Sequence, residues 1–264
     1  MSHIEVGDID VCYELKGEGP PLVMIMGFTA SKEWWEPKLI DRLSASHQLL
    51  LFDNRGAGNS TAGTRAFTVK RFADDTAMLM AELGIKKTDV IGASMGGMIA
   101  QEFAINYPGK TGRLVLMCTS CGGIHGTMPK PSVLKPLVKR YPTPEEQMRN
   151  SIEVLYPAEW AAANPEAVEA TIGAACAAPI SPRNARRQMG AIFTHHTYGR
   201  LPLIKSPTYV MCGDSDVLLP PRNSETIAGR IPGAKLRVWP NGGHGFAMQY
   251  PEEVQDELLS FLDE

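Results

Sequence analysis

The chain has 264 residues, of which 44% are hydrophobic and 21% are charged, and its formal net charge is -3. This length and apolar content suffice for one large α/β domain with a single buried core. No basic run or stripe is present to follow a phosphate backbone, which excludes nucleic acid as an expected partner.

The N-terminal stretch MSHIEVGDIDVCYEL alternates acidic and apolar residues. It lacks the basic and apolar segments of a secretory signal, and no run of about 18 apolar residues occurs anywhere in the chain. We therefore expect a soluble, cytoplasmic protein with no membrane partner. The odd number of cysteines, mostly in apolar surroundings, predicts reduced, buried thiols in place of a disulfide framework. They are Cys12, Cys118, Cys121, Cys176 and Cys212.

Strand and helix patterns alternate through the first half of the chain. A turn at Gly7-Asp8 divides the first strand region, and the continuous apolar run LLLF is typical of a strand buried on both faces. The predicted strands are 3–15, 21–26, 49–52, 87–92 and 113–118, and the predicted helices are 68–83 and 95–107, the latter ended by Pro108. This alternation predicts a mostly parallel central sheet flanked by helices on both faces.

Residues 120–200 break the pattern, because they hold many prolines and helical stretches of small residues but no convincing strand. The strand rhythm resumes at 207–212 and 235–239, each followed by a helical segment. We therefore expect a sheet core formed by 1–119 and 201–264, with 120–200 as a helical cap inserted after the sixth strand. The small apolar residues of this cap predict a largely hydrophobic substrate chamber.

The stretch DVIGASMGGMIAQEF, residues 89–103, places a serine between a strand and a helix. Its GASMG segment matches the G-x-S-x-G nucleophile elbow, in which flanking glycines remove side chains that would collide in a strained turn. The alternative is a glycine-rich turn with a serine at the helix N-terminus. The elbow predicts Ser94 as the nucleophile and the backbone N–H of Met95 as one oxyanion donor.

A serine nucleophile needs a histidine to take its proton and a carboxylate to orient that histidine. His244 lies in NGGHGF directly after the last predicted strand, at the end of the sheet where Ser94 also lies. The other histidines fall in the cap or far from any late strand. Asp214 and Asp216 both follow the strand at 207–212, and their positions alone do not separate them.

The segments GASMGG, DNRGAGNS, GDSDVLLP and GGHGF together resemble the α/β-hydrolase fold superfamily, in its small serine-esterase and lactonase branch with a helical cap. Enol-lactonases and cofactor-free perhydrolases are similar. The resemblance implies that the acid is Asp216, the last residue of a Gly-x-x-Asp stretch, with Pro220 four residues later. It also implies that the N–H of Phe28 is the second oxyanion donor, with Met26 in place of the usual histidine.

Other motifs favour structural roles. The GxG of RGAGNS lacks the third glycine of a dinucleotide site, and the resemblance implies that Asp53 and Arg55 instead anchor neighbouring loops. The pair Cys118-x-x-Cys121 has no second pair for a metal, and the adjacent His195-His196 point about 100° apart on a helix. Trp35, beside Trp34, is a candidate pocket residue or a core residue.

These features predict a serine hydrolase that cleaves a small carboxylic ester or lactone through an acyl-enzyme, with no metal or organic cofactor. Three alternatives remain open: a C–C bond hydrolase, a cofactor-free perhydrolase, and a ligand receptor that kept the hydrolase fold. Sustained turnover separates an enzyme from a receptor. The sequence leaves open whether the chain is a monomer or a homodimer.

Overall fold

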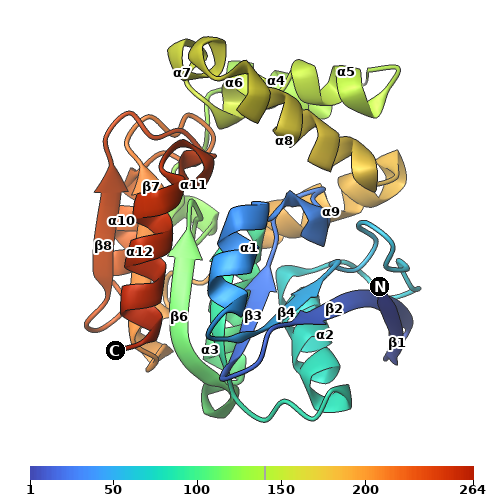
Figure 1. Ribbon diagram of the computed structural model, residues 1–264, viewed down its shortest axis with the longest axis vertical. Coiled ribbons are helices and arrows are strands. Elements are labelled where there is room, and N and C mark those ends of the chain that lie inside the picture. The colour runs from blue at the N-terminus through green and yellow to red at the C-terminus, as the bar shows by residue number, and fades with distance from the viewer. Residues whose placement is uncertain (140) are drawn as a thin grey trace.

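Eight strands form one sheet in the order β1-β2-β4-β3-β5-β6-β7-β8 (Figure 1). The structure is a computed structural model that describes residues 1–139 and 141–264. The strands are β1 (Ser2–Val6), β2 (Ile9–Lys16), β3 (Pro21–Ile25), β4 (Gln48–Phe52), β5 (Thr88–Ala93), β6 (Thr111–Met117), β7 (Thr208–Gly213) and β8 (Lys235–Trp239).

The sheet is mostly parallel, as the sequence predicts. β1 pairs with β2 and β2 with β4 in antiparallel ladders, whereas every pairing from β4 to β8 is parallel. The central strand β3 has β4 on one side and β5 on the other. The carboxyl ends of β3, β5, β6, β7 and β8 therefore meet along one edge of the sheet.

Helices cover both faces of this sheet (Figure 1). The core helices are α1 (Pro37–Ser44), α2 (Val69–Glu82), α3 (Met95–Asn106), α10 (Arg222–Ala228), α11 (Phe246–Gln249) and α12 (Pro251–Leu262). Apolar side chains of α2, α3 and α10 build the core on one face, and those of α1 and α12 build it on the other. The prediction of helices on both faces is confirmed.

Side-chain alternation in the strands supplies both cores at once. In β3, Val23 and Ile25 face the α2–α3 side, whereas Leu22 and Met24 face the α1–α12 side. All four are fully buried. Each such side chain stabilises the fold by about 1.5–3 kcal/mol relative to an exposed position, which is why the central strands are apolar throughout.

Local signals set the ends of the helices that frame the site. The hydroxyl of Thr68 accepts the N–H of Arg71 at 3.0 Å and caps the start of α2. Gly84 follows this helix with φ +72°, a conformation in which glycine is not strained. Pro108 lies two residues after the end of α3, and it opens a short 3₁₀ turn.

Between β6 and β7 the chain is helical, with one isolated bridge between Gly122 and His196. The helices are α4 (Pro131–Val138), α5 (Pro144–Arg149), α6 (Ile152–Leu155), α7 (Ala158–Ala163), α8 (Pro165–Ala177) and α9 (Pro182–Thr194). Four of them, α5 to α8, lie beyond the carboxyl ends of β6 and β7 (Figure 1). The predicted cap, 120–200, contains Arg140, which lies outside the described residues.

This helical segment has a small apolar cluster of its own. The buried members are Met148, Ile152, Tyr156 and Ile172. Short 3₁₀ turns complete the described chain: η1 (Lys32–Trp34), η2 (Pro108–Lys110), η3 (Gly123–His125) and η4 (Leu201–Leu203). No helix in the described part of the chain has the length and apolar character needed to cross a membrane.

Candidate active site

Ser94 occupies the sharp turn between β5 and α3, where the sequence predicts a nucleophile. Its backbone has φ 57° and ψ -120°, and its N–H donates to the carbonyl of Met117 on β6 at 2.9 Å. Such a conformation costs a non-glycine residue about 1–3 kcal/mol, which the surrounding structure must offset. The neighbouring strand and helix thus hold Ser94 at the carboxyl edge of the sheet.

Two glycines make this turn possible, in agreement with the motif. A Cβ added at Gly92 would lie 2.4 Å from the carbonyl oxygen of Gly96, and one added at Gly96 would lie 2.0 Å from that of Ile25. Both obstacles are backbone atoms, which cannot move aside as a flexible side chain would. The close approach of α3 to β3 and β5 therefore requires glycine at both positions.

Asp216 and His244 meet at the same edge of the sheet. The Nδ1 atom of His244 lies 2.8 Å from Oδ2 of Asp216, and both side chains are buried. The other carboxylate oxygen, Oδ1, accepts the backbone N–H groups of Leu218 and Leu219, each at 2.8 Å. An ionised carboxylate can only accept hydrogen bonds, so Nδ1 of His244 must carry a proton and donate it to Oδ2. Nε2 is then free to accept a proton.

The structure separates the two carboxylates that the sequence alone leaves open. Asp214 is exposed, and its Oδ1 accepts the hydroxyl of its neighbour Ser215 at 2.9 Å. Asp216 is only 3% exposed and faces His244. The geometry thus pairs His244 with the carboxylate that the family resemblance selects.

No hydrogen bond joins Ser94 Oγ to His244 among the described residues. Both residues nevertheless lie at the same edge of the sheet, Ser94 after β5 and His244 after β8, with β6 and β7 between these two strands. Catalytic hydrogen bonds are often long before substrate binds, so the absence of this bond is compatible with a catalytic pair of Ser94 and His244.

The loop after β3 approaches Ser94 closely. A Cβ added at Gly27 would lie 3.0 Å from Cβ of Ser94 and 3.5 Å from its Oγ. Neither the N–H of Phe28 nor that of Met95 donates to an acceptor in the described residues, so both donors are free. The carbonyl of Met26 accepts Nδ2 of Asn54 at 2.8 Å, and this bond holds the loop from the core side.

Residues of the helical segment pack directly on the histidine loop. The N–H of Gly245 donates to the carbonyl of Leu155 at 2.9 Å. A Cβ added at Gly243 would lie 2.5 Å from the same carbonyl oxygen, and one added at Gly245 would lie 2.4 Å from the ring of Tyr156. These glycines let the α6–α7 connection approach His244.

Backbone strain gathers at this edge of the sheet. Four non-glycine residues of the described chain have positive φ, and each lies just beyond the carboxyl end of a strand: Thr29, Ser94, Cys118 and Asn241. Strained backbone tends to occur where a site needs side chains in special positions. The distribution therefore marks the same edge as the buried Asp216–His244 pair does.

The five cysteines are free thiols, as the sequence predicts. Burial raises the pKa of Cys118 well above its ordinary value, and the negative charge of Asp216 adds to this effect. Burial likewise raises the pKa of Cys212 to about 11. Both thiols therefore stay protonated at neutral pH and are poor competitors of Ser94 as nucleophiles.

The two tryptophans differ in their surroundings. Trp35 is 6% exposed and packs in the core between the sheet and α1. Trp34 is partly buried and contacts both that core and the apolar cluster of the helical segment. Of the two, Trp34 spans the junction of the two parts, whereas pocket lining by Trp35 stays a prediction.

The motifs assigned to structural roles behave accordingly. Asp53 accepts the backbone N–H of Lys32 at 2.7 Å and that of Asn59 at 2.8 Å. Arg55 is fully buried and pairs with Asp75 and Asp8. The prediction that Asp53 and Arg55 anchor neighbouring loops is confirmed.

The expectation that His195 and His196 lie on a helix is wrong: α9 ends at Thr194, His195 has an extended backbone, and His196 forms a bridge with Gly122. His195 is buried and His196 is exposed. Within residues 1–139 and 141–264, no group of three or more His, Cys, Asp or Glu side chains is arranged to hold a metal ion.

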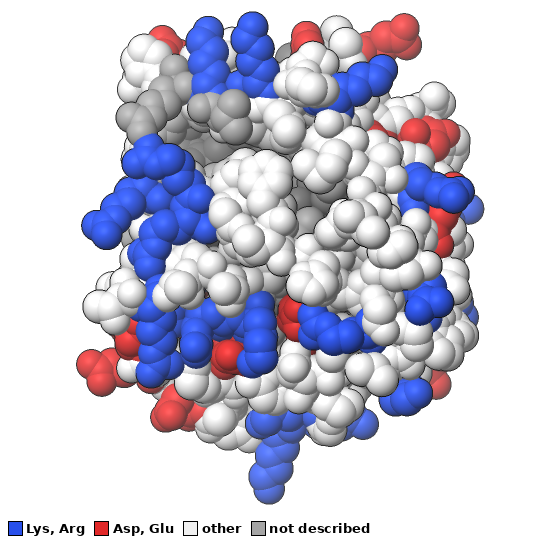
Figure 2. Space-filling model, turned by 180° about the vertical axis from the view of Figure 1, so that it is seen from behind, with Lys and Arg blue, Asp and Glu red and all other residues white. Residues whose placement is uncertain are grey.

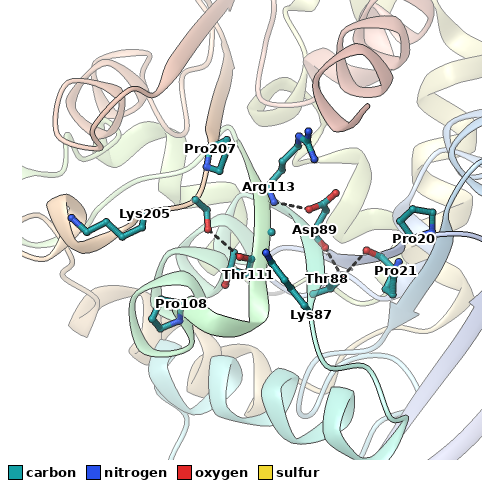
Figure 3. A pocket seen from close by; sticks show the side chains of 12 residues that line it. Pro20, Pro21, Lys87, Thr88, Asp89, Pro108, Thr111, Arg113, Lys205 and Pro207 are labelled. Carbon is teal, nitrogen blue, oxygen red and sulfur yellow. Dashed lines mark hydrogen bonds between the residues drawn. The ribbon is translucent and has the colours of Figure 1, made fainter. Parts of the chain in front are cut away.

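A cavity of about 500 Å³ lies at the opposite edge of the sheet (Figure 3). It is lined by the amino ends of β5 and β6, by Pro21 at the start of β3 and by Pro207 just before β7. Its lining includes Lys87, Arg113 and Lys205. This cavity is separated from Ser94 by the length of the strands. On the back of the molecule, uncharged side chains fill the centre, and Lys and Arg side chains lie to its left and in a row below it (Figure 2).

Sequence reasoning missed one buried polar residue beside the site. Oε1 of Gln188, on α9, accepts the N–H of Thr29 in the loop after β3 at 2.9 Å. The two residues are 159 positions apart in the chain. No local motif in the sequence marks this contact. The burial of Gln188 on an otherwise polar helix is the feature that indicates it.

Comparison with known proteins agrees with this geometry. A family model described as alpha/beta hydrolase fold matches residues 20–157, just over half of the chain. A relative from Azorhizobium caulinodans, named "Putative carbamate hydrolase RutD", is 26% identical over 264 residues, which cover 100% of this chain and 99% of that protein.

Solved structures show the same fold. The enol-lactonase from Burkholderia xenovorans LB400 superposes with a TM-score of 0.88 at 20% identity, covering 100% of both chains. A thermophilic esterase from Thermogutta terrifontis gives 0.85 at 25% identity, covering 100% of this chain and 98% of that one. These similarities and the family match support a hydrolase, and the chain belongs to the alpha/beta hydrolase fold family.

Proposed function

We propose that this protein is a serine hydrolase that cleaves a small carboxylic ester or lactone with Ser94, His244 and Asp216. The observation that carries the proposal is the buried 2.8 Å contact between His244 and Asp216, at the sheet edge where Ser94 occupies a strained turn. A buried histidine–carboxylate pair beside such a serine is the arrangement that activates a hydroxyl nucleophile.

Each member of the triad has a distinct role. Oγ of Ser94 attacks the carbonyl carbon while Nε2 of His244 takes its proton, and the same nitrogen then protonates the leaving alcohol. Asp216 keeps the proton of His244 on Nδ1 and stabilises the imidazolium that forms. Water, activated by His244 in the same way, hydrolyses the acyl-enzyme and regenerates Ser94.

The negative charge of the tetrahedral intermediate falls on the former carbonyl oxygen. We assign the backbone N–H groups of Phe28 and Met95 as its donors, because neither has an acceptor among the described residues. Met95 follows Ser94 in the chain, and Phe28 follows Gly27, which lies against Ser94. Loss of one such donor costs about 3 kcal/mol in a serine protease. Because both donors are backbone groups, the presence of Met26 in place of a histidine leaves this part of the mechanism intact.

The helical segment 120–200 serves as a cap on the core formed by 1–119 and 201–264. Two contacts support this assignment: the bond from Gly245 to Leu155 and the bond from Thr29 to Gln188. The first bond joins the cap to the loop after β8 that carries His244. The second joins it to the loop after β3 that carries Phe28, called the oxyanion loop below. The cap thus contributes to both sides of the site and shapes the substrate chamber.

The similar proteins point to acyl groups bonded to oxygen or nitrogen. One relative is named a carbamate hydrolase, and two similar structures are an enol-lactonase and an esterase. All three names describe attack on a carbonyl carbon that carries a leaving group, which is the step that Ser94 would perform. A carbamate is therefore the second substrate class to test.

The test is multiple-turnover release of p-nitrophenol from p-nitrophenyl esters of increasing acyl length, with p-nitrophenyl N-methylcarbamate as a further substrate. Ser94→Ala is compared with Ser215→Ala, which removes an exposed hydroxyl next to Asp214. We expect sustained turnover that Ser94→Ala abolishes and Ser215→Ala retains. Equal turnover by Ser94→Ala, or release that stops after one equivalent of product, would contradict the proposal.

A further inference from the structure

Helix α9 docks on the core through one face. Nδ2 of Asn184 donates to the carbonyl of Gly56 at 3.1 Å, and the guanidinium of Arg187 donates to the carbonyl of Arg65 at 2.8 Å. Gln188 follows on the same face, since residues three and four positions apart are neighbours on a helix. Gln188 therefore lies on the face of α9 that packs on the core, beside two contacts that do not involve the oxyanion loop.

Gln188 is fully buried against the loop that carries Phe28. Its Oε1 accepts the N–H of Thr29 at 2.9 Å. Thr29 has φ 63°, a conformation that is unfavourable for a β-branched residue. The bond from Gln188 therefore helps to hold Thr29 in a strained conformation, and with it the adjacent peptide that contains the N–H of Phe28.

The hydrogen bond to Thr29 also fixes which way the amide of Gln188 points. An N–H needs an acceptor, so the oxygen must face Thr29 and Nε2 must point elsewhere. Nε2 is buried and has no hydrogen-bond partner among the described residues. A buried donor without a partner costs about 1–3 kcal/mol, a penalty that a bound acceptor would remove.

Some other buried polar atoms without a partner among the described residues belong to the chain near the oxyanion loop or to a residue bonded to it. They include Oγ of Ser31 and Nε1 of Trp35, both on the chain that follows the oxyanion loop. Oδ1 of Asn54, whose Nδ2 holds Met26, is a third. Further unpaired atoms belong to His195, Ser224 and Trp239. Buried polar groups are normally satisfied, and of these atoms Nε2 of Gln188 belongs to a side chain that bonds directly to the oxyanion loop.

We propose that Gln188 has two roles in the reaction of the proposed hydrolase: Oε1 positions the oxyanion loop, and Nε2 donates to a second acceptor on the substrate. This inference rests on the proposed function. It names the substrate class more narrowly, as an ester or lactone whose acyl part carries another hydrogen-bond acceptor, such as a ketone or ether oxygen, a few bonds from the scissile carbonyl.

The substrates of the test are matched pairs. p-Nitrophenyl pentanoate is compared with p-nitrophenyl 4-oxopentanoate, which replaces one methylene with a carbonyl, and p-nitrophenyl butanoate with p-nitrophenyl methoxyacetate. We expect the wild type to prefer the oxygenated member of at least one pair by about tenfold in kcat/KM, the value of one added hydrogen bond in a buried site.

Two substitutions separate the two roles of the amide. Gln188→Met keeps the length of the side chain and removes both polar atoms, so it should lower kcat on all esters by about tenfold or more while KM changes little. Gln188→Glu keeps an acceptor for Thr29, so it should recover most of that kcat. Both variants should lose the preference for the oxygenated ester.

Asn184→Ala is the matched control, because it removes a bond between α9 and the core that does not touch the oxyanion loop. It should retain the substrate preference, and thermal unfolding of each variant shows whether the fold is kept. The proposal is overturned if the wild type hydrolyses the esters without any preference, or if Gln188→Met behaves as Asn184→Ala does. Absence of Ser94-dependent turnover in the wild type would instead overturn the proposed function itself.

Discussion

Replacing Asp216 with asparagine should abolish most activity while leaving the fold intact. Oδ1 of Asp216 accepts two backbone N–H groups, from Leu218 and Leu219. The amide oxygen of an asparagine would stay on these donors, which turns its NH₂ group toward Nδ1 of His244. His244 would then have to accept at Nδ1 and carry its proton on Nε2, where it can no longer take the proton of Ser94.

The size of the effect follows from the chemistry of the triad. The same substitution in a serine protease lowers kcat by about 10⁴-fold, which corresponds to about 5.5 kcal/mol of transition-state stabilisation. Here the pair is buried in the same way, and asparagine preserves the bonds to Leu218 and Leu219. We therefore expect a loss of about 10³–10⁴-fold in kcat with only a small change in Tm.

The assay is steady-state release of p-nitrophenol at pH 8, together with a thermal melt of each variant. Asp214→Asn serves as the control because Asp214 is exposed and bonds only to Ser215. It should keep activity within about twofold of the wild type. The reasoning is refuted if Asp216→Asn retains more than a tenth of the wild-type kcat, or if both substitutions have equal effects.

Three further predictions concern packing and charge. Gly245→Ala should lower both kcat and Tm, because the new methyl group would lie 2.4 Å from the ring of Tyr156. Burial lowers the pKa of His195 to about 4, below its ordinary 6.5, so on acidification the unfolded chain takes up a proton that the folded chain does not. The free energy of unfolding should therefore fall by about 2 kcal/mol between pH 7 and pH 5. His195→Leu should remove this contribution to the pH dependence. Asp75→Asn leaves the fully buried Arg55 without its bidentate partner and should cost about 3 kcal/mol in urea denaturation.

Each of these has its own contradicting result. Gly199→Ala, where an added Cβ meets nothing within 4 Å, is the control for Gly245→Ala, and equal effects would show that the Tyr156 contact is not responsible. An unchanged pH dependence in His195→Leu would assign the acid sensitivity to other groups. Wild-type stability in Asp75→Asn would mean that the charge of Arg55 is already satisfied elsewhere.

Much of the sheet was predictable because its signals are local. The run LLLF has apolar residues at consecutive positions, as is typical of a strand covered on both faces, and it forms most of β4. The G-x-S-x-G segment specifies the turn at Ser94, since Gly92 and Gly96 sit where a Cβ would strike backbone. In both cases the residues that determine the structure are neighbours in the sequence.

The contacts that complete the site are not local, and for this reason the sequence does not reveal them. The positions of Asp214 and Asp216 in the sequence do not separate them; the family resemblance selects Asp216, and the fold shows that its carboxylate faces His244. Thr29 carries no sign of its positive φ, because threonine rarely adopts it. The partner that holds it, Gln188, lies on a helix whose docking depends on the whole insertion.

The proposed mechanism requires that Ser94 forms a covalent acyl-enzyme. The most direct test is to mix the wild type with a p-nitrophenyl ester, quench with acid within one turnover, and locate the added acyl mass by peptide mass spectrometry. The mechanism predicts this mass on the peptide that contains Ser94, at an amount matching the burst of p-nitrophenol, and none in Ser94→Ala. Sustained turnover without an adduct, or an adduct on another residue such as Cys118, would contradict it.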